Sequence, residues 1–181
     1  RMKITWHGTA SILQESEGER LLFDPVVELA GASNPNSLED FVQETDICIT
    51  HGHVDHLFFI PEILEQADAT VFATRAVMNT LEGWVEDTGC LVEVEPGYSW
   101  RQGNMRITVL KGKHTSFCAK TVFRKLLNPR LLRYFRNALF LAWAHPRFPE
   151  KGETAAYQIE AEGKRILLLG SMELDPVTVY P

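Results

Sequence analysis

Three histidines and an aspartate lie within six consecutive residues, from His51 to His56. The run follows the apolar stretch 47–50, which reads as a buried strand. Side chains two residues apart project to the same side of an extended or tightly turned backbone, so we expect His51 and His53 to converge on one cation. Asp55 and His56 follow where the chain leaves the strand, and a turn would aim them at a second position nearby. Imidazole nitrogen and carboxylate oxygen suit zinc, with iron or manganese as alternatives.

A metal ion in this run would support hydrolysis. An ion with three protein ligands and an open position lowers the pKa of bound water from about 15.7 to about 7, and so supplies metal-bound hydroxide at neutral pH. The same ion stabilises the charge that develops on a carbonyl or phosphoryl oxygen. Asp55 is the candidate catalytic residue, because it would both bind a second ion and orient the attacking water.

Two simpler interpretations of the run are disfavoured. A solvated loop would not be expected to collect three of the six histidines of the chain directly behind a strand. A closed zinc site that only stabilises the fold would favour cysteine ligands, and the run contains no cysteine. The cysteines of the chain are scattered and form no CxxC pair, at Cys48, Cys90 and Cys118. A hydrolytic site is therefore the better interpretation.

The elements that must position the run alternate between strands and helices. Short apolar runs bounded by turn residues predict strands at Lys3–Trp6, Ser11–Gln14, Arg20–Phe23, Asp46–Thr50, Val71–Ala73, Leu91–Glu95, Met105–Leu110, Ala155–Glu160 and Arg165–Leu169. Apolar residues at helical spacing predict helices at Pro61–Ala67 and Ala76–Trp84. Ser37 with Asp40 resembles a capping box that starts a further helix. This order predicts a layered α/β domain whose sheets are mixed or antiparallel.

The composition is that of an ordinary globular chain. Its 181 residues, 45% of them hydrophobic, suffice for one domain with a full core and are too few for two. The formal net charge of −6 gives no general attraction to polyanions and disfavours nucleic acid as a partner. No apolar run reaches the ~18 residues of a membrane span, and no signal-peptide pattern begins the sequence. Together with the unpaired cysteines, these features favour the cytoplasm.

With these blocks in place, the sequence resembles the metallo-β-lactamase-fold hydrolases and is most similar to the branch of ascorbate-6-phosphate-lactonase-like proteins. The blocks that carry the resemblance span nearly the whole chain: Ile4 to Ser11, Leu22 to Pro25, Thr50 to His56, Gly112 to His114, and Ile166 to Gly170. The resemblance implies a four-layer αββα sandwich of two mixed, largely antiparallel sheets, with the metal ions at one edge between them. We expect a single domain over residues 1–181.

The resemblance also implies a ligand set for two ions. His51, His53 and His114 would bind the first metal, and Asp55 and His56 would bind the second. Taken alone, a histidine after a strand, such as His114, is more often a surface or capping residue than a ligand. Its place in the order of the family makes it a candidate. Zinc, as one or two ions, is the implied cofactor, with manganese or iron as alternatives.

The chain departs from the family pattern at two places. The family usually has an aspartate after the glycine that ends the last of these strands, where it bridges the metals, but here Gly170 is followed by Ser171. A serine hydroxyl is uncharged and a poorer ligand, and neither Glu173 nor Asp175 stands at the expected offset to replace it. The family also has a final histidine beyond a further strand and helix. This sequence ends at Pro181 before such a segment, which leaves open that it lacks the C-terminal part of the fold.

The segment 118–151 is the part least like the family and reads as an insertion. Helical spacing of its apolar residues predicts a basic amphipathic helix, with apolar Leu131, Leu132, Phe135, Ala138, Leu139 and Ala142, aromatic Phe140 and Trp143, and basic Lys120, Arg124, Lys125, Arg130, Arg133 and Arg136. Packing on the domain or on a second subunit, as in a homo-oligomer, is the favoured role. Two others stay open: a lid whose arginines receive a substrate phosphate or carboxylate, and contact of residues 120–143 with an anionic membrane surface.

Three further polar residues need an interpretation. Asp24, before Pro25 at a strand end, either fixes a ligand histidine through its other ring nitrogen or caps a turn. His7 is expected to be structural, with a contact to a ligand residue as the alternative. His145, before Pro146 in a loop, has no partner visible in sequence and is expected to be exposed.

Three functions follow, in decreasing order of support. The first is a metal-dependent hydrolase that uses metal-bound hydroxide on a small, anionic ester, lactone or phosphodiester. The alternative is a metal-binding protein with a partial site and little or no catalysis, because Ser171 and the absent final histidine leave the second metal incomplete. The third is a nucleic-acid phosphodiesterase, which the acidic net charge opposes. Sequence does not identify the substrate, because one fold hosts many reactions.

Overall fold

The structure is a computed structural model, and it describes residues 1–27, 36–43, 46–112, 135–149 and 153–171. Its strands are β1 (Lys3–Gly8), β2 (Ser11–Ser16), β3 (Glu19–Phe23), β4 (Asp46–Cys48), β5 (Val71–Ala73), β6 (Leu91–Glu93), β7 (Ser99–Gln102), β8 (Met105–Gly112), β9 (Thr154–Ala161) and β10 (Lys164–Leu168). Its helices are α1 (Val54–Leu57), α2 (Ile60–Leu64), α3 (Arg75–Leu81) and α5 (Phe135–Ala144), with short 3-10 turns η1 (Leu38–Asp40) and η2 (Thr88–Cys90).

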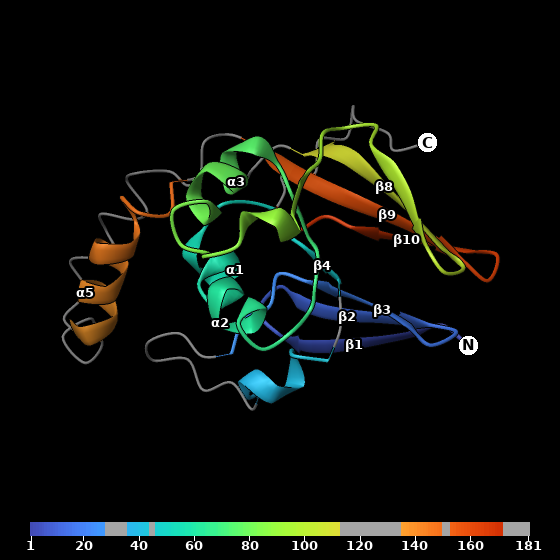
Figure 1. The fold of residues 1–181 in the computed structure, drawn as a ribbon, viewed down its shortest axis with the longest axis horizontal. Coiled ribbons are helices and arrows are strands. Elements are labelled where there is room, and N and C mark those ends of the chain that lie inside the picture. Colours follow the sequence, from blue (N-terminus) through green and yellow to red (C-terminus); the bar gives the residue numbers. More distant parts are fainter. Residues whose placement is uncertain (28–35, 44–45, 113–134, 150–152, 172–181) are drawn as a thin grey trace.

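Two sheets face each other, with β1 to β3 in one and β8 to β10 in the other (Figure 1). The first sheet has six strands in the order β1-β2-β3-β4-β5-β6, and the second has four in the order β10-β9-β8-β7. In the first sheet β1 to β3 pair antiparallel through tight turns, whereas β3 to β6 pair parallel through longer crossovers. The second sheet is antiparallel throughout. The mixed α/β architecture with two sheets confirms the predicted fold class.

A hydrophobic core fills the space between the sheets. Side chains alternate along a strand, so Leu21 and Phe23 of β3 face this core while Leu22 faces the opposite side of the sheet. The second sheet contributes its own alternate residues, among them Met105, Ile107, Val109, Tyr157 and Ile159. The two sheets are therefore held together mainly by burial of apolar surface, which stabilises by about 25 cal/mol per Å².

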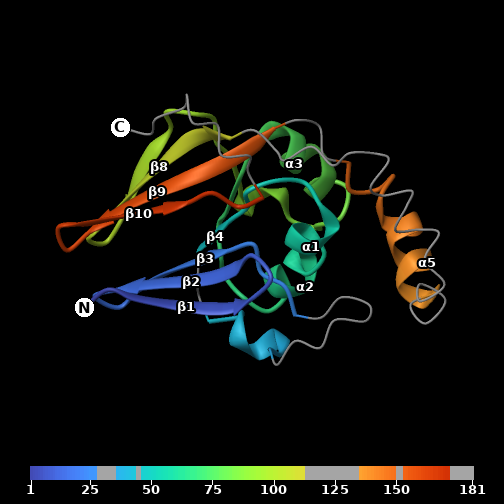
Figure 2. The same ribbon diagram turned by 180° about the vertical axis from the view of Figure 1, so that it is seen from behind.

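Helices cover the other face of the first sheet. Leu57 of α1, Ile63 of α2 and Leu81 of α3 are buried in one cluster with Leu22 and Ile47 of the sheet. Figure 2 shows these helices from behind, grouped at one end of the strands, with α5 beyond them. Among the described residues, the order of layers is thus helices, first sheet, second sheet.

Several predicted elements differ from those observed. The strand β7 was not predicted, because its sequence Ser-Trp-Arg-Gln has only one apolar residue to mark a buried face. The strand predicted to end at Thr50 ends at Cys48. The helix predicted after Ser37 is only the turn η1, although the backbone N–H of Ser37 does donate to Asp40 Oδ2 at 2.8 Å. The turn expected at the end of the histidine run is the short helix α1, which begins after His53.

The segment 118–151 is described only in part. The helix α5 agrees with the predicted helical spacing over residues 135–144, while Arg133 and the other basic residues up to 130 lie outside the described residues. Rings near the end of α5 pack on the rest of the chain: Phe140 and Trp143 lie 5.6 and 6.4 Å from Phe58, centroid to centroid. No helix in the described part of the chain is long and apolar enough to cross a membrane.

Candidate metal centre

The residues of the candidate site follow two neighbouring parallel strands. β3 is followed by Asp24, and β4 ends at Cys48, two residues before Thr50. Parallel strands bring their carboxyl ends to the same edge of a sheet, where ligands of open α/β sheets bind. The backbone N–H of Asp24 donates to the Cys48 carbonyl at 3.1 Å and joins these two ends. The N–H of Ala155 donates to the Thr50 carbonyl at 2.7 Å, which fixes the second sheet to the same edge.

The run brings three imidazole rings into contact. The ring centroid of His51 lies 4.0 Å from that of His56 and 4.7 Å from that of His53. His51 Nε2 lies 3.1 Å from His53 Nδ1, and His56 Nε2 lies 3.6 Å from Asp55 Oδ2. His51 and His56 are buried, whereas the Asp55 side chain is 35% exposed. The structure therefore brings together the part of the predicted ligand set that it describes.

Asp24 and Thr50 orient two of these rings. Both oxygens of the buried Asp24 accept from Thr50, Oδ1 from the backbone N–H at 2.8 Å and Oδ2 from the hydroxyl at 2.7 Å. Since the hydroxyl proton goes to Asp24, Thr50 Oγ1 must accept from Nδ1–H of His51, 3.0 Å away. Nδ1 of His56 lies 3.0 Å from Asp24 Oδ2. Both rings are thus held by Nδ1, which leaves Nε2 as the nitrogen that each presents to a metal.

The carboxylate of Asp24 therefore contacts a predicted ligand, as the first of its two interpretations requires. Its φ of 44° lies in the left-handed region, which non-glycine residues adopt at a cost and often at functional sites. Burial by itself lowers the pKa of His56, but Asp24 and then Asp55 outweigh it, so that this pKa is raised above its ordinary value. A field that favours a proton on this buried ring also favours a metal cation beside it.

The donor atoms fit metal ions as two pairs. Two nitrogens on one tetrahedral zinc lie about 3.3 Å apart, close to the 3.1 Å between the ring nitrogens of His51 and His53. Asp55 and His56 form the second pair. Within the described residues, no three His, Cys, Asp or Glu side chains are grouped so that they could hold one ion. Three predicted candidates for a completing ligand lie outside the described residues: His114, Glu173 and Asp175.

Gly170 packs against Thr50 on the side of the second sheet. It follows β10 with a φ of 58°, and a Cβ there would lie 2.8 Å from Thr50 Oγ1. A larger residue would therefore displace the hydroxyl that orients His51. Ser171, where the resemblance implies an aspartate, is exposed and comes next in the chain. Sequence reasoning missed the roles of Thr50 and Gly170. Only the position of each at a strand end, beside a predicted site residue, pointed to them.

The two remaining histidines of interest lie apart from the ligand pairs. His7 Nδ1 lies 3.2 Å from Asn36 Oδ1, and its ring packs edge-on against Phe41 at 5.3 Å. These contacts agree with a structural role for His7. His145 is exposed, as expected, but it also lines a pocket with the His53 and Asp55 side of the run.

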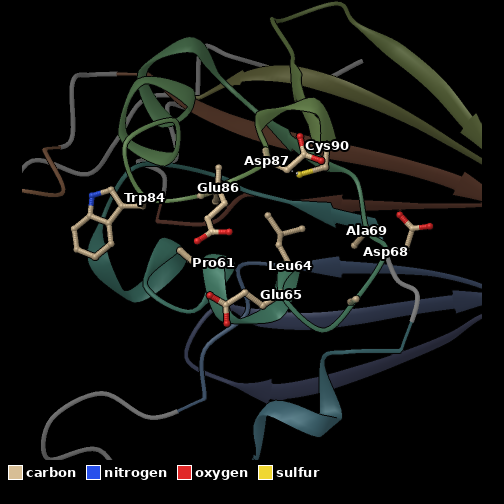
Figure 3. Close-up of a pocket in the computed structure, with 11 residues that line it drawn as sticks. Pro61, Leu64, Glu65, Asp68, Ala69, Trp84, Glu86, Asp87 and Cys90 are labelled. Atoms are coloured by element: carbon tan, nitrogen blue, oxygen red, sulfur yellow. Dashed lines mark hydrogen bonds between the residues drawn. The ribbon is translucent and has the colours of Figure 1, made fainter.

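A separate acidic groove lies between α2 and the chain that leads from α3 to β6 (Figure 3). Carboxylates surround Leu64, and Trp84 stands at one end; the carboxylates are Glu65, Asp68, Glu86 and Asp87. No histidine of the described residues lines this groove. The histidine run, by contrast, brings three imidazole rings together beside a carboxylate, so it remains the candidate metal centre.

Comparison with known proteins finds relatives by sequence. A profile of the β-lactamase superfamily domain matches residues 19–127. A protein of Pyrococcus furiosus named a UPF0173 protein is 31% identical over 116 residues, which cover 62% of this chain and 50% of that protein. The UPF0173 metal-dependent hydrolase YtkL of Bacillus subtilis is 35% identical over 83 residues, which cover 46% of this chain and 35% of that protein. The matched part thus spans half or less of these relatives.

Solved structures share the fold. Igni18, a metallo hydrolase from Ignicoccus hospitalis, matches with a TM-score of 0.61 at 18% identity, over 96% of this chain and 62% of that chain. CmlA, a diiron β-hydroxylase from Streptomyces venezuelae, matches with a TM-score of 0.57 at 15% identity, over 98% of this chain and 31% of that chain. At these identities the likeness concerns the fold alone.

Proposed function

The chain belongs to the β-lactamase superfamily and has the metallo-β-lactamase fold, and from that premise we propose that it is a metal-dependent hydrolase. One observation carries the proposal. Four donor side chains of the histidine run lie as two close pairs at the carboxyl edge of the parallel strands, and Asp24 with Thr50 holds two of the rings by Nδ1. Relatives named metal-dependent hydrolases give the same indication.

The residues of the run would have different roles in metal binding and catalysis. His51 and His53 would hold one ion, with His114 as the implied third ligand, and Asp55 and His56 would hold a second. When bound, such an ion lowers the pKa of a water molecule and polarises the substrate oxygen. Asp55 is partly exposed, so its carboxylate can reach the attacking water, orient it and accept its proton.

The identity of the metal, the class of substrate and the location in the cell belong to the same proposal. Imidazole and carboxylate donors suit zinc, with iron or manganese as alternatives, and the fold also occurs in a diiron protein. We propose a small-molecule ester, lactone or phosphodiester as the substrate and the cytoplasm as the location. A nucleic-acid substrate has less support, because the net charge of −6 repels a polyanion.

Hydrolysis before and after removal of metal tests the proposal. Purified protein would be offered 4-nitrophenyl acetate, γ-butyrolactone and bis(4-nitrophenyl) phosphate, then treated with EDTA and reloaded with zinc, iron or manganese. We expect turnover of at least one substrate to disappear with the metal and to return with one of the ions. His53→Ala should abolish both metal binding and turnover, while His7→Gln, a histidine outside the run, should retain both. Full turnover by EDTA-treated protein would overturn the proposal.

A second candidate function is metal binding with little or no catalysis. It is favoured by Ser171 at the position where the resemblance implies a bridging aspartate. On this account the protein would hold one ion per chain and turn over none of the three substrates. Turnover together with two ions per chain would exclude it.

A further inference from the structure

A pocket of about 300 Å³ separates the histidine run from the end of α5. Its walls come from two segments that are far apart in sequence. Residues of the run form one wall, and the last residue of α5 with residues of the following loop forms the other, namely His53, Val54, Asp55, Ala144, His145 and Phe148. Anything bound here would touch both the candidate ligands and the loop that follows α5.

The loop after α5 is held in place by several contacts. The backbone N–H groups of Arg147 and Phe148 both donate to the Ala144 carbonyl at 2.9 Å. The ring of Phe148 is 3% exposed and lies 4.9 Å from that of Trp84 and 6.3 Å from that of Phe58. These contacts fix the position of the wall before any ligand arrives.

The loop also packs directly on the histidine run. A Cβ on Gly52 would lie 3.1 Å from the carbonyl oxygen of Pro149, so the two backbones touch between His51 and His53. Preformed pockets bind with less loss of conformational entropy than pockets that must be ordered by the ligand. The pocket is therefore a built part of the site rather than a gap beside a loose loop.

The chemistry of the pocket is apolar with a polar rim. Val54, Ala144 and Phe148 supply hydrocarbon, while Asp55 places a carboxylate at the side of the run. No lysine or arginine of the described residues lines the pocket, so a negatively charged group would find no such partner there. His145 forms no hydrogen bond or ion pair with other described residues, and its side chain is exposed. Its ring nitrogens are thus available to a bound molecule.

We propose that this pocket binds an uncharged apolar chain or ring of the substrate, and that His145 is a specificity residue that donates a hydrogen bond to a carbonyl oxygen next to that chain. The inference rests on the proposed function, because it takes the histidine run as the place where the substrate reacts. It sharpens the substrate class to esters or lactones with an apolar acyl group. A charged group of the substrate would lie outside this pocket.

Binding of two amides that differ only in chain length tests the pocket without requiring turnover. Metal-loaded protein would be titrated with acetamide and hexanamide while tryptophan fluorescence is recorded, because Trp84 and Trp143 adjoin Phe148. Each buried methylene strengthens binding about fourfold, so hexanamide should bind at least tenfold more tightly. Phe148→Leu should reduce this ratio. Equal affinity for the two amides would overturn the proposal.

Variants of His145 test the hydrogen bond. His145→Phe keeps a ring but loses the donor, and we expect hexanamide to bind about five- to tenfold more weakly, in line with one hydrogen bond. His145→Gln restores a donor and should recover most of the affinity, with metal content unchanged in both variants. Wild-type affinity in His145→Phe would refute the assignment of His145.

Kinetics with 4-nitrophenyl hexanoate separates the inference from the proposed function. For an active enzyme, His145→Phe should lower kcat/KM for the hexanoate ester more than for the acetate ester, and His145→Gln should restore it. Tight, His145-dependent binding of hexanamide without hydrolysis of any ester, lactone or phosphodiester would sustain the pocket and overturn the proposed function. Ester hydrolysis whose rate depends neither on chain length nor on His145 would support the proposed function and overturn the pocket proposal.

Discussion

Asp24 connects the two parallel strands to the two buried histidines. Through the Thr50 hydroxyl it fixes the ring of His51, and through its own Oδ2 it contacts the ring of His56. Residues that orient metal ligands in this way matter for affinity almost as much as the ligands themselves. The geometry of the site thus depends on two residues outside the candidate ligand set.

Replacing the carboxylate should weaken metal binding while leaving every ligand in place. In Asp24→Asn the amide can no longer accept from both Thr50 and His56, so metal affinity should fall about 10- to 100-fold. A competition titration with a chromogenic chelator measures it. Asp46→Asn is the matched control, because Asp46 lies at the other end of β4, where it accepts from the Thr70 N–H at 3.2 Å. Equal affinity in the two variants would contradict this role of Asp24.

Gly170 offers a sharper test of the contact with Thr50. Gly170→Ala and Gly163→Ala both place an alanine at positive φ, which costs about 1–2 kcal/mol, but a Cβ on Gly163 meets nothing within 4 Å. Both variants should lose similar backbone stability, while only Gly170→Ala should push Thr50 aside and lower metal affinity, by about tenfold. Parallel thermal melts and metal titrations separate the two effects. Identical metal affinities would show that the Thr50 contact has no part in the site.

At the scale of residues, the sequence predicted the candidate ligands but not the residues that orient them. The two-residue alternation of His51 and His53 predicted that they converge, and their nitrogens lie 3.1 Å apart. Thr50 and Gly170 carry no such signal, because their role arises only where β4 and β10 meet in space. Whether His114 completes the first pair stays a prediction.

At the scale of elements, Tyr157 links the two sheets beside the site. It belongs to β9, is fully buried, and its hydroxyl donates to the Ile49 carbonyl at 2.8 Å with the Phe72 carbonyl 3.3 Å away. Ile49 immediately precedes Thr50, so this bond helps to hold the residues that orient the histidines. Burial raises the pKa of the Tyr157 hydroxyl well above its ordinary value, which keeps the proton that it donates.

Removing this hydroxyl should destabilise the junction of the sheets. Tyr157→Phe leaves the Ile49 carbonyl without this donor, whereas the Phe72 carbonyl still accepts from the Ile49 N–H at 3.0 Å, and the free energy of unfolding should fall by about 1–2 kcal/mol. Tyr98→Phe, at a residue that is 38% exposed, should change it by less than about 0.5 kcal/mol. Urea denaturation of both variants makes the comparison. No difference between them would mean that the bond contributes nothing to the junction.

Most elements were predictable because hydrophobic periodicity is a local property. The meander β1 to β3 and the pair β9 and β10 follow from alternation and turn residues. The strand β7 was missed because its partner β8, rather than its own composition, holds it in the sheet. The helix α1 was missed because its four residues are too few to show a period. Tertiary contacts decide such short elements.

At the scale of the whole molecule, metal binding and folding should be coupled. The candidate ligands join β4 to α1, and Asp24 joins them to β3, so an ion would hold segments that separate on unfolding. A ligand at 100 times its Kd stabilises the native state by about 2.7 kcal/mol. The candidate centre would therefore contribute to stability as well as to chemistry.

Chelation should lower the melting temperature of the protein. For a chain of this size a loss of about 2.7 kcal/mol corresponds to a decrease of about 5–10 °C, measured by calorimetry with and without EDTA. His53→Ala should melt at the temperature of the chelated protein and should not respond to EDTA. A melting temperature that chelation leaves unchanged in the wild type would separate metal binding from the stability of the fold.

The position of the bound metal tests the central claim most directly. Crystals grown with zinc and measured on both sides of its absorption edge would give an anomalous difference map that locates the ion. We predict a peak at roughly 2.0–2.1 Å from both His51 Nε2 and His53 Nδ1. A zinc peak in the acidic groove of Figure 3, beside Glu65 or Asp87, with none at the histidine run would contradict the account.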